Sequence, residues 1–235
     1  MEKLKSITAQ FGLELSDRQI HQFERYYELL VEWNSFMNLT AITEKDDVIV
    51  KHFADSLLLY KYKNLHDNIR LIDVGTGAGF PGIPLKIAFP EINVTLMDSL
   101  NKRLNFLNEV IKELELDNVD TVHARAEDGG RNPIYREQYD LVVSRAVANL
   151  STLSEWFLPF VRVGGYFIPY KSNALSDEMN NGKKTIRILG GQVENIFNTT
   201  IPDTDNQRSF VFVKKISKTD KKYPRKPGAS KKPIV

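Results

Sequence analysis

The first 66 residues carry apolar side chains at the three- and four-residue spacing of amphipathic helices. Ser16 and Gln19 have the spacing of a capping box, which predicts that a helix begins there. Its apolar face comprises Ile20, Phe23, Tyr27 and Leu30. Thr43 and Asp46 offer a second capping box, ahead of a helix whose apolar face comprises Val48, Phe53 and Leu57. Residues 1–66 are therefore predicted to form a helical cap packed on a main domain.

From Arg70 onward, short apolar runs alternate with amphipathic segments. Strands are predicted at 70–75, 92–98, 119–124, 139–147 and 164–171. Helices are predicted between and after them, at 82–89, 99–116, 151–161 and 174–191. Two further runs, 192–200 and 208–215, are close enough to pair as antiparallel strands at one edge. This alternation predicts an α/β, Rossmann-like fold with a mostly parallel sheet, which binds its ligands beyond the carboxyl ends of the strands.

Composition narrows the classes of protein that fit. The chain has 235 residues, 42% hydrophobic and 26% charged, as in an ordinary soluble globular protein. No apolar run approaches the roughly 18 residues of a membrane span, and the start lacks the apolar core of a signal peptide. The absence of Cys excludes disulfides, thiolate metal sites and a Cys nucleophile, and only four His are present. We expect a cytoplasmic, monomeric protein that uses no metal and no membrane.

Charge is unevenly distributed along the chain. Residues 214–235 hold nine Lys or Arg against one Asp, a charge of +8, so the total of +2 leaves −6 on residues 1–213. We expect the main domain to span residues 67–216 and a basic tail to span residues 217–235. Such a tail fits either a polyanionic partner held through its phosphates or a solvated segment that only aids solubility. Charge alone favours neither.

A glycine-rich loop falls between the first predicted strand and the first helix after it. The sequence "LIDVGTGAGFPG" places alternating glycines at Gly75, Gly77 and Gly79, with Asp73 two residues before the first. Glycine permits a positive φ and lets a ligand approach the backbone closely. Because the loop lies where ligands of such sheets bind, we interpret it as a ligand-binding turn rather than a plain tight turn.

Two ligands compete for this loop. The stretch "GAGFPG" matches the dinucleotide fingerprint G-x-G-x-x-G, although the match begins two residues into the turn and contains Pro81. No second phosphate-binding turn follows residue 140. The stretch "IDVGTGAG" instead places an acid near the end of the strand, which suits a ligand with an ammonium group and no phosphate. S-adenosylmethionine is such a ligand.

The ends of the next strands agree with S-adenosylmethionine. Asp98 ends the second strand, where an acid accepts hydrogen bonds from ribose hydroxyls, although it could also cap the helix that follows. Ala126 and Glu127 follow the third strand and would lie at the adenine end. Arg145 ends the fourth strand, where the reactive methyl group would sit.

Several motifs in the same order resemble one known family. "LIDVGTGAGFPGIPL", "MDSLNKRLNFL", "RAED", "SRAV" and the terminal "KKYPRKPG" are similar to the RsmG (GidB) family, and so is "KHFADSL" in the helical cap. The resemblance covers nearly the whole chain. One departure is "GASKKP" near the C-terminus, where the family usually has Thr-Pro after the Gly.

The resemblance implies both a fold and an activity. The family has the class I S-adenosylmethionine-dependent methyltransferase fold, with a seven-stranded sheet and an N-terminal helical extension, and it methylates N7 of a guanine in 16S ribosomal RNA. The implied partner is this RNA or the small ribosomal subunit, and the product cofactor is S-adenosylhomocysteine. Carried over residue by residue, the cofactor contacts fall on Gly75, Phe80, Ala126, Glu127 and Arg145; Gly77 and Asp98 complete our expected set.

The residues also bear on the chemistry of the reaction. Pyrimidine C5 methylation commonly uses a Cys, which this chain lacks, and "SRAV" stands where amine methyltransferases carry an Asn/Asp-Pro-Pro-aromatic motif. Guanine N7 has a free lone pair, so it needs no general base, and we interpret His123 as structural. Arg145 could hold the cofactor or donate to guanine O6.

The remaining predictions concern RNA. We expect contacts from Lys171, at the end of the fifth strand, and from the tail residues Lys221, Lys222, Arg225 and Lys226. Two other functions stay open: an NAD(P) dehydrogenase, and a module that binds an adenosine-like ligand and RNA without catalysis.

Overall fold

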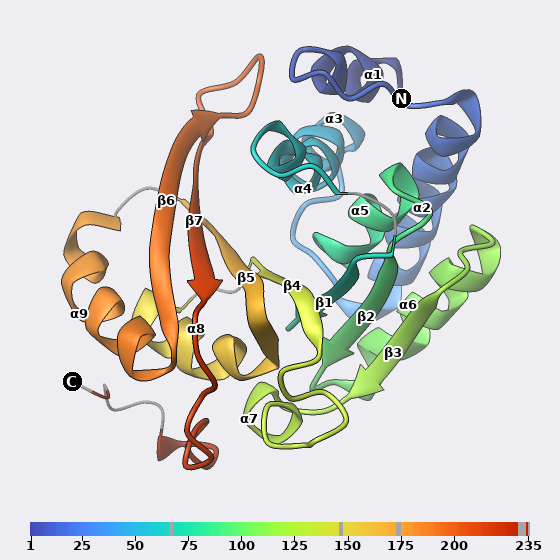
Figure 1. Ribbon diagram of the computed structural model, residues 1–235. Helices are drawn as coiled ribbons and strands as arrows, with labels where there is room; N and C mark the ends of the chain where they lie inside the picture. Colours follow the sequence, from blue (N-terminus) through green and yellow to red (C-terminus); the bar gives the residue numbers. More distant parts are fainter. Residues whose placement is uncertain (66–67, 146–147, 173–174, 230–233, 235) are drawn as a thin grey trace.

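A computed structural model describes residues 1–65, 68–145, 148–172, 175–229 and 234. A central sheet has helices on both of its faces, and a helical region lies against one end of it (Figure 1). Within the described residues, seven strands form the sheet: β1 (Arg70–Val74), β2 (Asn93–Asp98), β3 (Val119–His123), β4 (Tyr139–Ser144), β5 (Val161–Lys171), β6 (Gly191–Thr200) and β7 (Gln207–Lys215).

The strand order β3-β2-β1-β4-β5-β7-β6 confirms the predicted fold class. Strands β1 to β5 are mutually parallel, and β7 runs antiparallel to both β5 and β6. Ile72 of β1 is paired with Thr95 on one side and with Val142 on the other. The strand order changes direction beside β1, which places the glycine loop that follows it at the ligand-binding crevice of the sheet.

Helices cover both faces because successive strand residues point to opposite sides. Leu71 and Val143 pack in one core with the helices on their side, and Ile72 and Val142 pack in the other. The covering elements are α5 (Gly82–Ala88), α6 (Asn101–Glu113), α7 (Ala126–Gly129), α8 (Leu150–Phe157), η3 (Leu158–Phe160) and α9 (Leu175–Ile188). The short α7 was not predicted, and β5 begins at Val161 rather than at residue 164.

The N-terminal region is helical, as the sequence predicts. Its elements are α1 (Glu2–Ala9), α2 (Asp17–Met37), α3 (Lys45–Val48), the π-helix η1 (Ile49–Ala54), α4 (Asp55–Leu57) and η2 (Leu58–Lys61). The capping box of Ser16 and Gln19 is present. The second capping box was wrong: α3 has Glu44 as its N-cap and no side-chain cap bond. The N-cap therefore lies one residue after the predicted Thr43, so Asp46 cannot close the box.

The apolar face of α2 differs from the prediction by one residue. Phe23 and Leu30 are fully buried, but Tyr26 is buried in place of the half-buried Tyr27. The Tyr26 hydroxyl donates to Ala78 O, which ties the helical region to the glycine loop. Phe53 of the helical region shares a continuous core with Leu71 of the sheet. The domain boundaries at residues 66 and 216 stay predictions.

Candidate functional site

The glycine loop is open toward solvent on one side and packed on the other. Gly75, Gly77 and Gly79 have φ values of +72°, +63° and +98°. A Cβ added to Gly75 or Gly77 would meet no protein atom within 4 Å, whereas one added to Gly79 would lie 2.6 Å from the Tyr26 hydroxyl. Gly79 is therefore needed for packing. Gly75 and Gly77 leave space beside the backbone that a ligand can fill.

Asp73 holds the loop in shape. Its Oδ2 accepts hydrogen bonds from Thr76 Oγ1 at 2.7 Å and from the Gly82 amide at 2.9 Å. Its Oδ1 is buried and has no hydrogen-bond partner among the described residues. Burial raises the pKa of Asp73 to about 6, against the lowering effect of these two hydrogen bonds. This carboxyl group is buried in the protein. Its role in the structure is to hold the turn by accepting hydrogen bonds from it.

Asp98, at the end of β2, connects the loop to α6. Its Oδ2 accepts from the Gly77 amide and its Oδ1 from the Leu100 amide, both at 2.9 Å. Arg103 forms an ion pair with it at 3.2 Å. The N-cap position of α6 is Leu100, without a side-chain cap bond, so Asp98 is not the N-cap of the helix. Its carboxylate instead lies where the loop, β2 and α6 meet.

The predicted residues at the strand ends line a small cavity of about 380 Å³. Asp98 comes from the end of β2, while Ala126 and Glu127 begin α7, directly after the third strand. Trp156 and Phe157 of α8 also line it. This cavity combines aromatic rings with a buried carboxylate, which suits a planar heterocycle carrying polar edges.

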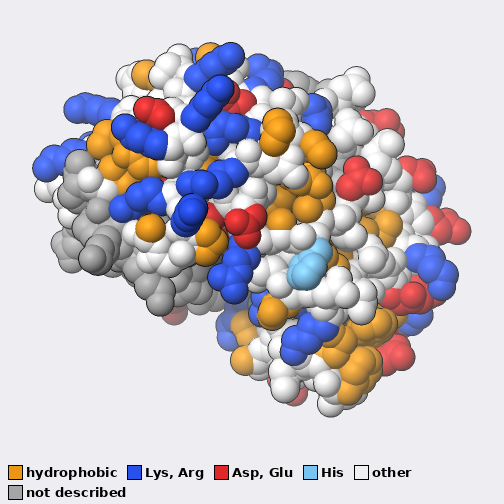
Figure 2. All heavy atoms as spheres, turned by 90° about the horizontal axis from the view of Figure 1, so that it is seen from below, with side chains coloured by type: hydrophobic (Ala, Val, Ile, Leu, Met, Phe, Trp, Pro, Cys, Tyr) orange, Lys and Arg blue, Asp and Glu red, His pale blue; other side chains and the backbone are white. Residues whose placement is uncertain are grey.

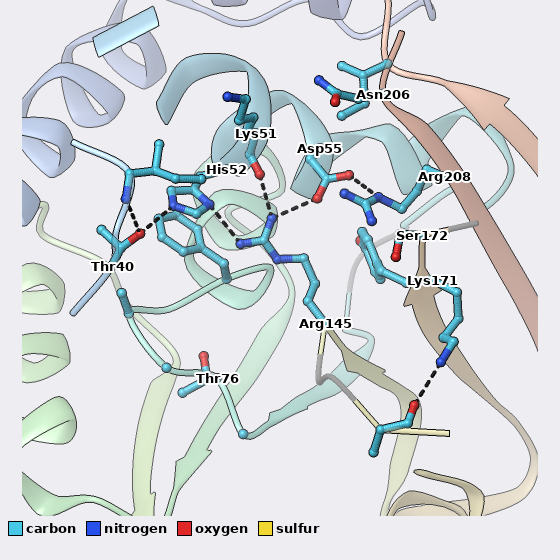
Figure 3. Close-up of a pocket in the computed structure, with 18 of the residues that line it drawn as sticks. Thr40, Lys51, His52, Asp55, Thr76, Arg145, Lys171, Ser172, Asn206 and Arg208 are labelled. Atoms are coloured by element: carbon cyan, nitrogen blue, oxygen red, sulfur yellow. Dashed lines mark hydrogen bonds and ion pairs between the residues drawn. The ribbon is translucent and has the colours of Figure 1, made fainter. Parts of the chain in front are cut away.

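A larger cavity of about 960 Å³ adjoins the same loop (Figure 3). Gly75 and Arg103 line both cavities, so the two form one cleft across the strand ends. The larger cavity is lined by residues from the loop, from the helical region, from the end of β4 onward and from β5 and β7. They include Gly75, Gly77, Phe80, Lys51, His52, Asp55, Arg145, Lys171 and Arg208.

Arg145 directly follows β4 and is held by the π-helix η1 and by α4. Its Nη1 donates to Lys51 O at 3.0 Å and to Asp55 Oδ2 at 2.8 Å, and its Nη2 contacts His52 Nδ1 at 3.2 Å. The guanidinium carbon lies 5.0 Å from the centre of the Phe80 ring. Figure 3 shows the guanidinium directed between His52 and Asp55. The helical region thus fixes the orientation of this arginine.

Asp55 pairs with two arginines. Its side chain is 1% exposed, and its Oδ1 accepts from Arg208 Nε of β7 at 2.6 Å while its Oδ2 binds Arg145. One buried carboxylate between two guanidinium groups leaves a local excess of positive charge. Together with Lys171 and Arg103, this makes the larger cavity suited to an anionic or electron-rich ligand.

His52 is neutral in this environment. Its ring stacks on Phe80, with centroids 4.4 Å apart and planes 15° apart. Burial first, and then the charge of Arg145, lower the pKa of His52 to about 4. Because Arg145 can only donate, His52 Nδ1 must accept, so the proton lies on Nε2 and is donated to Thr40 Oγ1 at 3.0 Å. Both ring nitrogens are thereby engaged.

Sequence reasoning missed His52, Asp55 and Arg208 as members of the site. A signal existed for two of them, because "KHFADSL" was one of the motifs of the resemblance and places His52 and Asp55 three residues apart on a helix. No comparable signal marked Arg208. It reaches the cluster only because β7 lies beside β5 in the sheet.

The predicted RNA-binding residues have different settings. Lys171 lines the larger cavity, where its Nζ donates to Ala148 O at 2.8 Å and pairs with Glu178 at 3.0 Å. In the tail, Lys221, Lys222 and Lys226 are exposed, whereas Arg225 forms an ion pair with Glu155 at 2.6 Å.

The tail lies at the bottom of the view in Figure 1, and Lys and Arg side chains gather on one side of that face (Figure 2). Lys231 and Lys232, which contribute to the predicted tail charge, lie outside the described residues. Whether these side chains bind RNA stays a prediction.

Neither a metal-binding cluster nor a membrane-spanning helix is present in the part of the chain that the structure describes. No three His, Asp or Glu side chains there converge in a way that could hold a metal ion. No helix within the same ranges has the length and apolar character needed to cross a membrane. The predicted use of no metal stays a prediction.

Comparison with known proteins identifies relatives across almost the entire chain. The GidB family model, described as rRNA small subunit methyltransferase G, matches residues 19–210. A Ribosomal RNA small subunit methyltransferase G of Lachnoclostridium phytofermentans is 53% identical over 225 residues, covering 95% of this chain and 93% of the relative. One from Bacillus cytotoxicus is 50% identical over 232 residues, covering 99% and 97%.

Solved structures resemble the fold at low sequence identity. TYW2 from M. jannaschii, solved in complex with AdoMet, matches with a TM-score of 0.53 at 17% identity, covering 65% of this chain and 72% of that one. TrmN from Thermus thermophilus matches with a TM-score of 0.53 at 16% identity, covering 72% and 53%. These likenesses agree with the class I methyltransferase fold. With the family match and the full-length relatives, the cleft at the strand ends belongs to an rRNA methyltransferase, and the chain is a member of the GidB family.

Proposed function

We propose that the protein transfers a methyl group from S-adenosylmethionine to N7 of one guanine in 16S ribosomal RNA. The observation that carries this proposal is the single cleft formed by two contiguous cavities at the strand ends, in a chain of the GidB family. One cavity has the size and lining for an adenosine, and the other is large enough for a methionine chain and an incoming base. The protein would act as a monomer in the bacterial cytoplasm, on this RNA or on the small subunit.

The residues of the cleft fit the proposed cofactor. Ala126 and Glu127 would hold the adenine, Asp98 the ribose, and the open faces of Gly75 and Gly77 the chain that leads to sulfur. S-adenosylmethionine supplies, when bound, a methyl group made electrophilic by the sulfonium charge. The ring of Phe80 would lie beside this methyl group, and the Arg145 guanidinium lies over that ring. These side chains would exclude water and leave one direction open for the nucleophile.

The larger cavity offers no free general base among its described residues. Both nitrogens of His52 are occupied, and its pKa near 4 leaves it neutral rather than basic at neutral pH. Asp55 is held by two arginines, and Glu178 pairs with Lys171. A nucleophile that must lose a proton would find no acceptor here. Guanine N7 already carries a lone pair, so it needs alignment rather than deprotonation.

Arg145 would act on the reacting groups from a fixed position. Three acceptors from the helical region hold one edge of its guanidinium. A group anchored in this way can donate to guanine O6 or to the cofactor without first losing rotational freedom. These two roles stay alternatives, and each makes the arginine important for the rate.

The nucleophile can be tested by replacing one atom of the substrate. Small-subunit RNA carrying 7-deazaguanine at the target would be incubated with the protein and radiolabelled S-adenosylmethionine. We expect binding to persist and methylation to disappear, because only the attacking nitrogen has been replaced. Label recovered in the 7-deaza RNA would show that another atom is methylated. Mapping of N7-methylguanine in RNA from cells with and without the gene identifies the target position.

The same assay separates the remaining alternatives. A non-catalytic adenosine- and RNA-binding module would bind both ligands and transfer no label to any RNA. A methyltransferase of another RNA or of a small molecule would leave the small-subunit RNA unlabelled and label a different substrate pool.

A further inference from the structure

The C-terminal segment is anchored to the protein body, whereas its charge alone had left a solvated tail open. We call residues 219–225 the strap. Thr219, Tyr223 and Pro224 are buried, while Lys221 and Lys222 of the same segment are exposed. Figure 1 shows the strap passing below α8 and close to α7. A solvated tail would not alternate between buried and exposed side chains in this way, so the strap has a defined seat.

The first anchor of the strap is Glu155 of α8. Its side chain is 1% exposed, and its carboxylate accepts from the Arg225 amide at 2.9 Å, from Nε at 2.8 Å and from Nη2 at 2.6 Å. These hydrogen bonds join residues 70 positions apart in the chain. A forked guanidinium pairing with both oxygens of a buried carboxylate fixes both partners in orientation.

The second anchor is the loop that follows α7. Arg136 donates to Gly130 O, Tyr223 O and Thr219 O, each at 2.8 Å. Arg131 Nε donates to Pro224 O at 2.7 Å. Arg136 also donates to Asp220 O at 3.2 Å, so one arginine joins the end of α7 to three carbonyls of the strap. The strap and this loop are held as a single unit.

The two anchored helices form the walls of the smaller cavity. Ala126 and Glu127 are the first residues of α7, and Trp156 directly follows Glu155 in α8. Gly130, at the C-terminal end of α7, packs so tightly on the strap that an added Cβ would lie 3.2 Å from Pro224 Cγ. The strap therefore contacts the outer side of both walls.

We propose that the strap positions the adenine-binding walls of the cleft, with the Glu155–Arg225 pair as its fixing point. This inference rests on the proposed cofactor site and adds to it a positioning role for residues that do not touch the cofactor. If Arg225 is removed, Glu155 loses a guanidinium in a buried place, and the carboxylate must take up a proton or move toward water. In either case α8 loses its ionic attachment to the strap, and Trp156 loses the support that this attachment gives.

The test compares single variants of the full-length chain. Glu155→Gln breaks the charge pair with little change of volume, Arg225→Gln removes the guanidinium, and Arg225→Lys keeps the charge without the fork. Lys218→Gln is the matched control, because Lys218 is exposed, lies just before the strap and loses the same charge. Affinities for S-adenosylhomocysteine and for 5′-methylthioadenosine are measured by calorimetry, and unfolding of each ligand-free variant is recorded first.

We expect Arg225→Gln and Glu155→Gln to weaken both ligands by about tenfold, and Arg225→Lys to have an intermediate effect. The loss should be equal for the two ligands, because both carry adenosine and only one carries the amino-acid chain. A general loosening of the protein would instead penalise the larger ligand more strongly. Affinities equal to those of Lys218→Gln would overturn the inference, as would a loss confined to S-adenosylhomocysteine.

The outcome also separates this inference from the proposed function. If the unaltered protein binds neither ligand, the cofactor assignment itself fails. If the unaltered protein binds both and the strap variants bind equally well, the cofactor assignment stands and only the positioning role is lost. Should Arg225→Gln fail to fold, Glu155→Gln decides alone, because its amide oxygen can still accept from the Arg225 amide.

Discussion

The two ends of the cleft are built in different ways. At the proposed adenine end, Asp98 is the last residue of β2 and Ala126 begins the helix after β3, so the order of strands along the chain brings them together. At the proposed reacting end, Asp55 binds Arg145 from 90 residues away and Arg208 from 153 residues away. The common fold supplies the first end. The second end depends on how the helical region is added to the sheet, which is where specialisation for one substrate can arise.

The largest expected effect is at the reacting end. Arg145→Ala should lower the single-turnover methylation rate by on the order of 10²–10³, the usual loss when one well-placed donor is removed from a reacting centre. Arg162→Ala is the control, since Arg162 is an exposed arginine in an ion pair with Asp140, outside the cleft. A loss below tenfold would mean that this end needs no fixed cation, and the contrast drawn above would fail.

A change in the glycine loop should affect both ends at once. Gly75→Val places a side chain in the space where the two cavities meet, so the increase in melting temperature caused by S-adenosylhomocysteine should vanish. That increase corresponds to about 2.7 kcal/mol at a ligand concentration of 100 Kd. Gly12→Val is a matched control, because Gly12 has a similar positive φ and the same open surroundings away from the cleft. NADH should stabilise neither the unaltered protein nor the control.

The free energy of unfolding should depend on pH through His52, which lies at the proposed reacting end of the cleft. The folded pKa near 4 lies below the ordinary 6.5, so the unfolded chain takes up a proton first as the pH falls. His52 therefore stabilises the fold fully above pH 6.5, and this contribution is lost as the pH falls toward 4, by roughly 3 kcal/mol. The free energy of unfolding of His52→Gln should lack this loss when both proteins are titrated by urea.

The comparison with the variant is needed because Asp73 changes the free energy of unfolding with pH in the opposite direction. Its raised pKa means that its contribution is present below pH 4 and is lost as the pH rises toward 6. The difference between the two proteins cancels this effect. An equal pH dependence of both would show that His52 keeps its ordinary pKa of 6.5 in the folded protein.

The smallest expected effect concerns the exposed lysines of the strap. Replacing Lys221 and Lys222 by Gln should weaken RNA binding by several-fold and reduce the slope of log K against log salt by about 0.7 for each phosphate that is no longer neutralised. Lys5→Gln with Lys112→Gln is a charge-matched control on other faces. Affinity for S-adenosylhomocysteine should not change in either variant. An unaltered slope would assign these lysines to solubility alone.

The sequence predicted features that depend on residues close together in the chain, and it failed for contacts between residues far apart in the chain. Alternating periodicity predicted the order of strands and helices, and the sequence predicted that the glycine loop and Asp98 lie together at the strand ends, because these are local patterns that one sheet brings together. The ion pair between Arg225 and Glu155 could not be predicted. A run of basic residues looks the same whether it is solvated or paired, and its partner lies 70 residues away.

Tyr26 shows a second reason for such errors. Both Tyr26 and Tyr27 fit a helical stripe within one position, and the choice between them was set by Ala78, whose carbonyl accepts from the Tyr26 hydroxyl. Tertiary packing thus selected the buried face of α2. The amphipathic pattern alone defined that face only to within a neighbouring residue.

Asp55 also constrains which substitutions can be accepted at Arg145 and Arg208 during evolution. Since one carboxylate balances both Arg145 and Arg208, the effects of substitutions at the three positions should not add, and a double-mutant cycle between the arginines should show coupling. A lineage that lost the carboxylate first would leave two cations facing each other, and one that lost an arginine would weaken the reason to keep the carboxylate. The three positions should therefore drift together or stay fixed together, as one inherited unit.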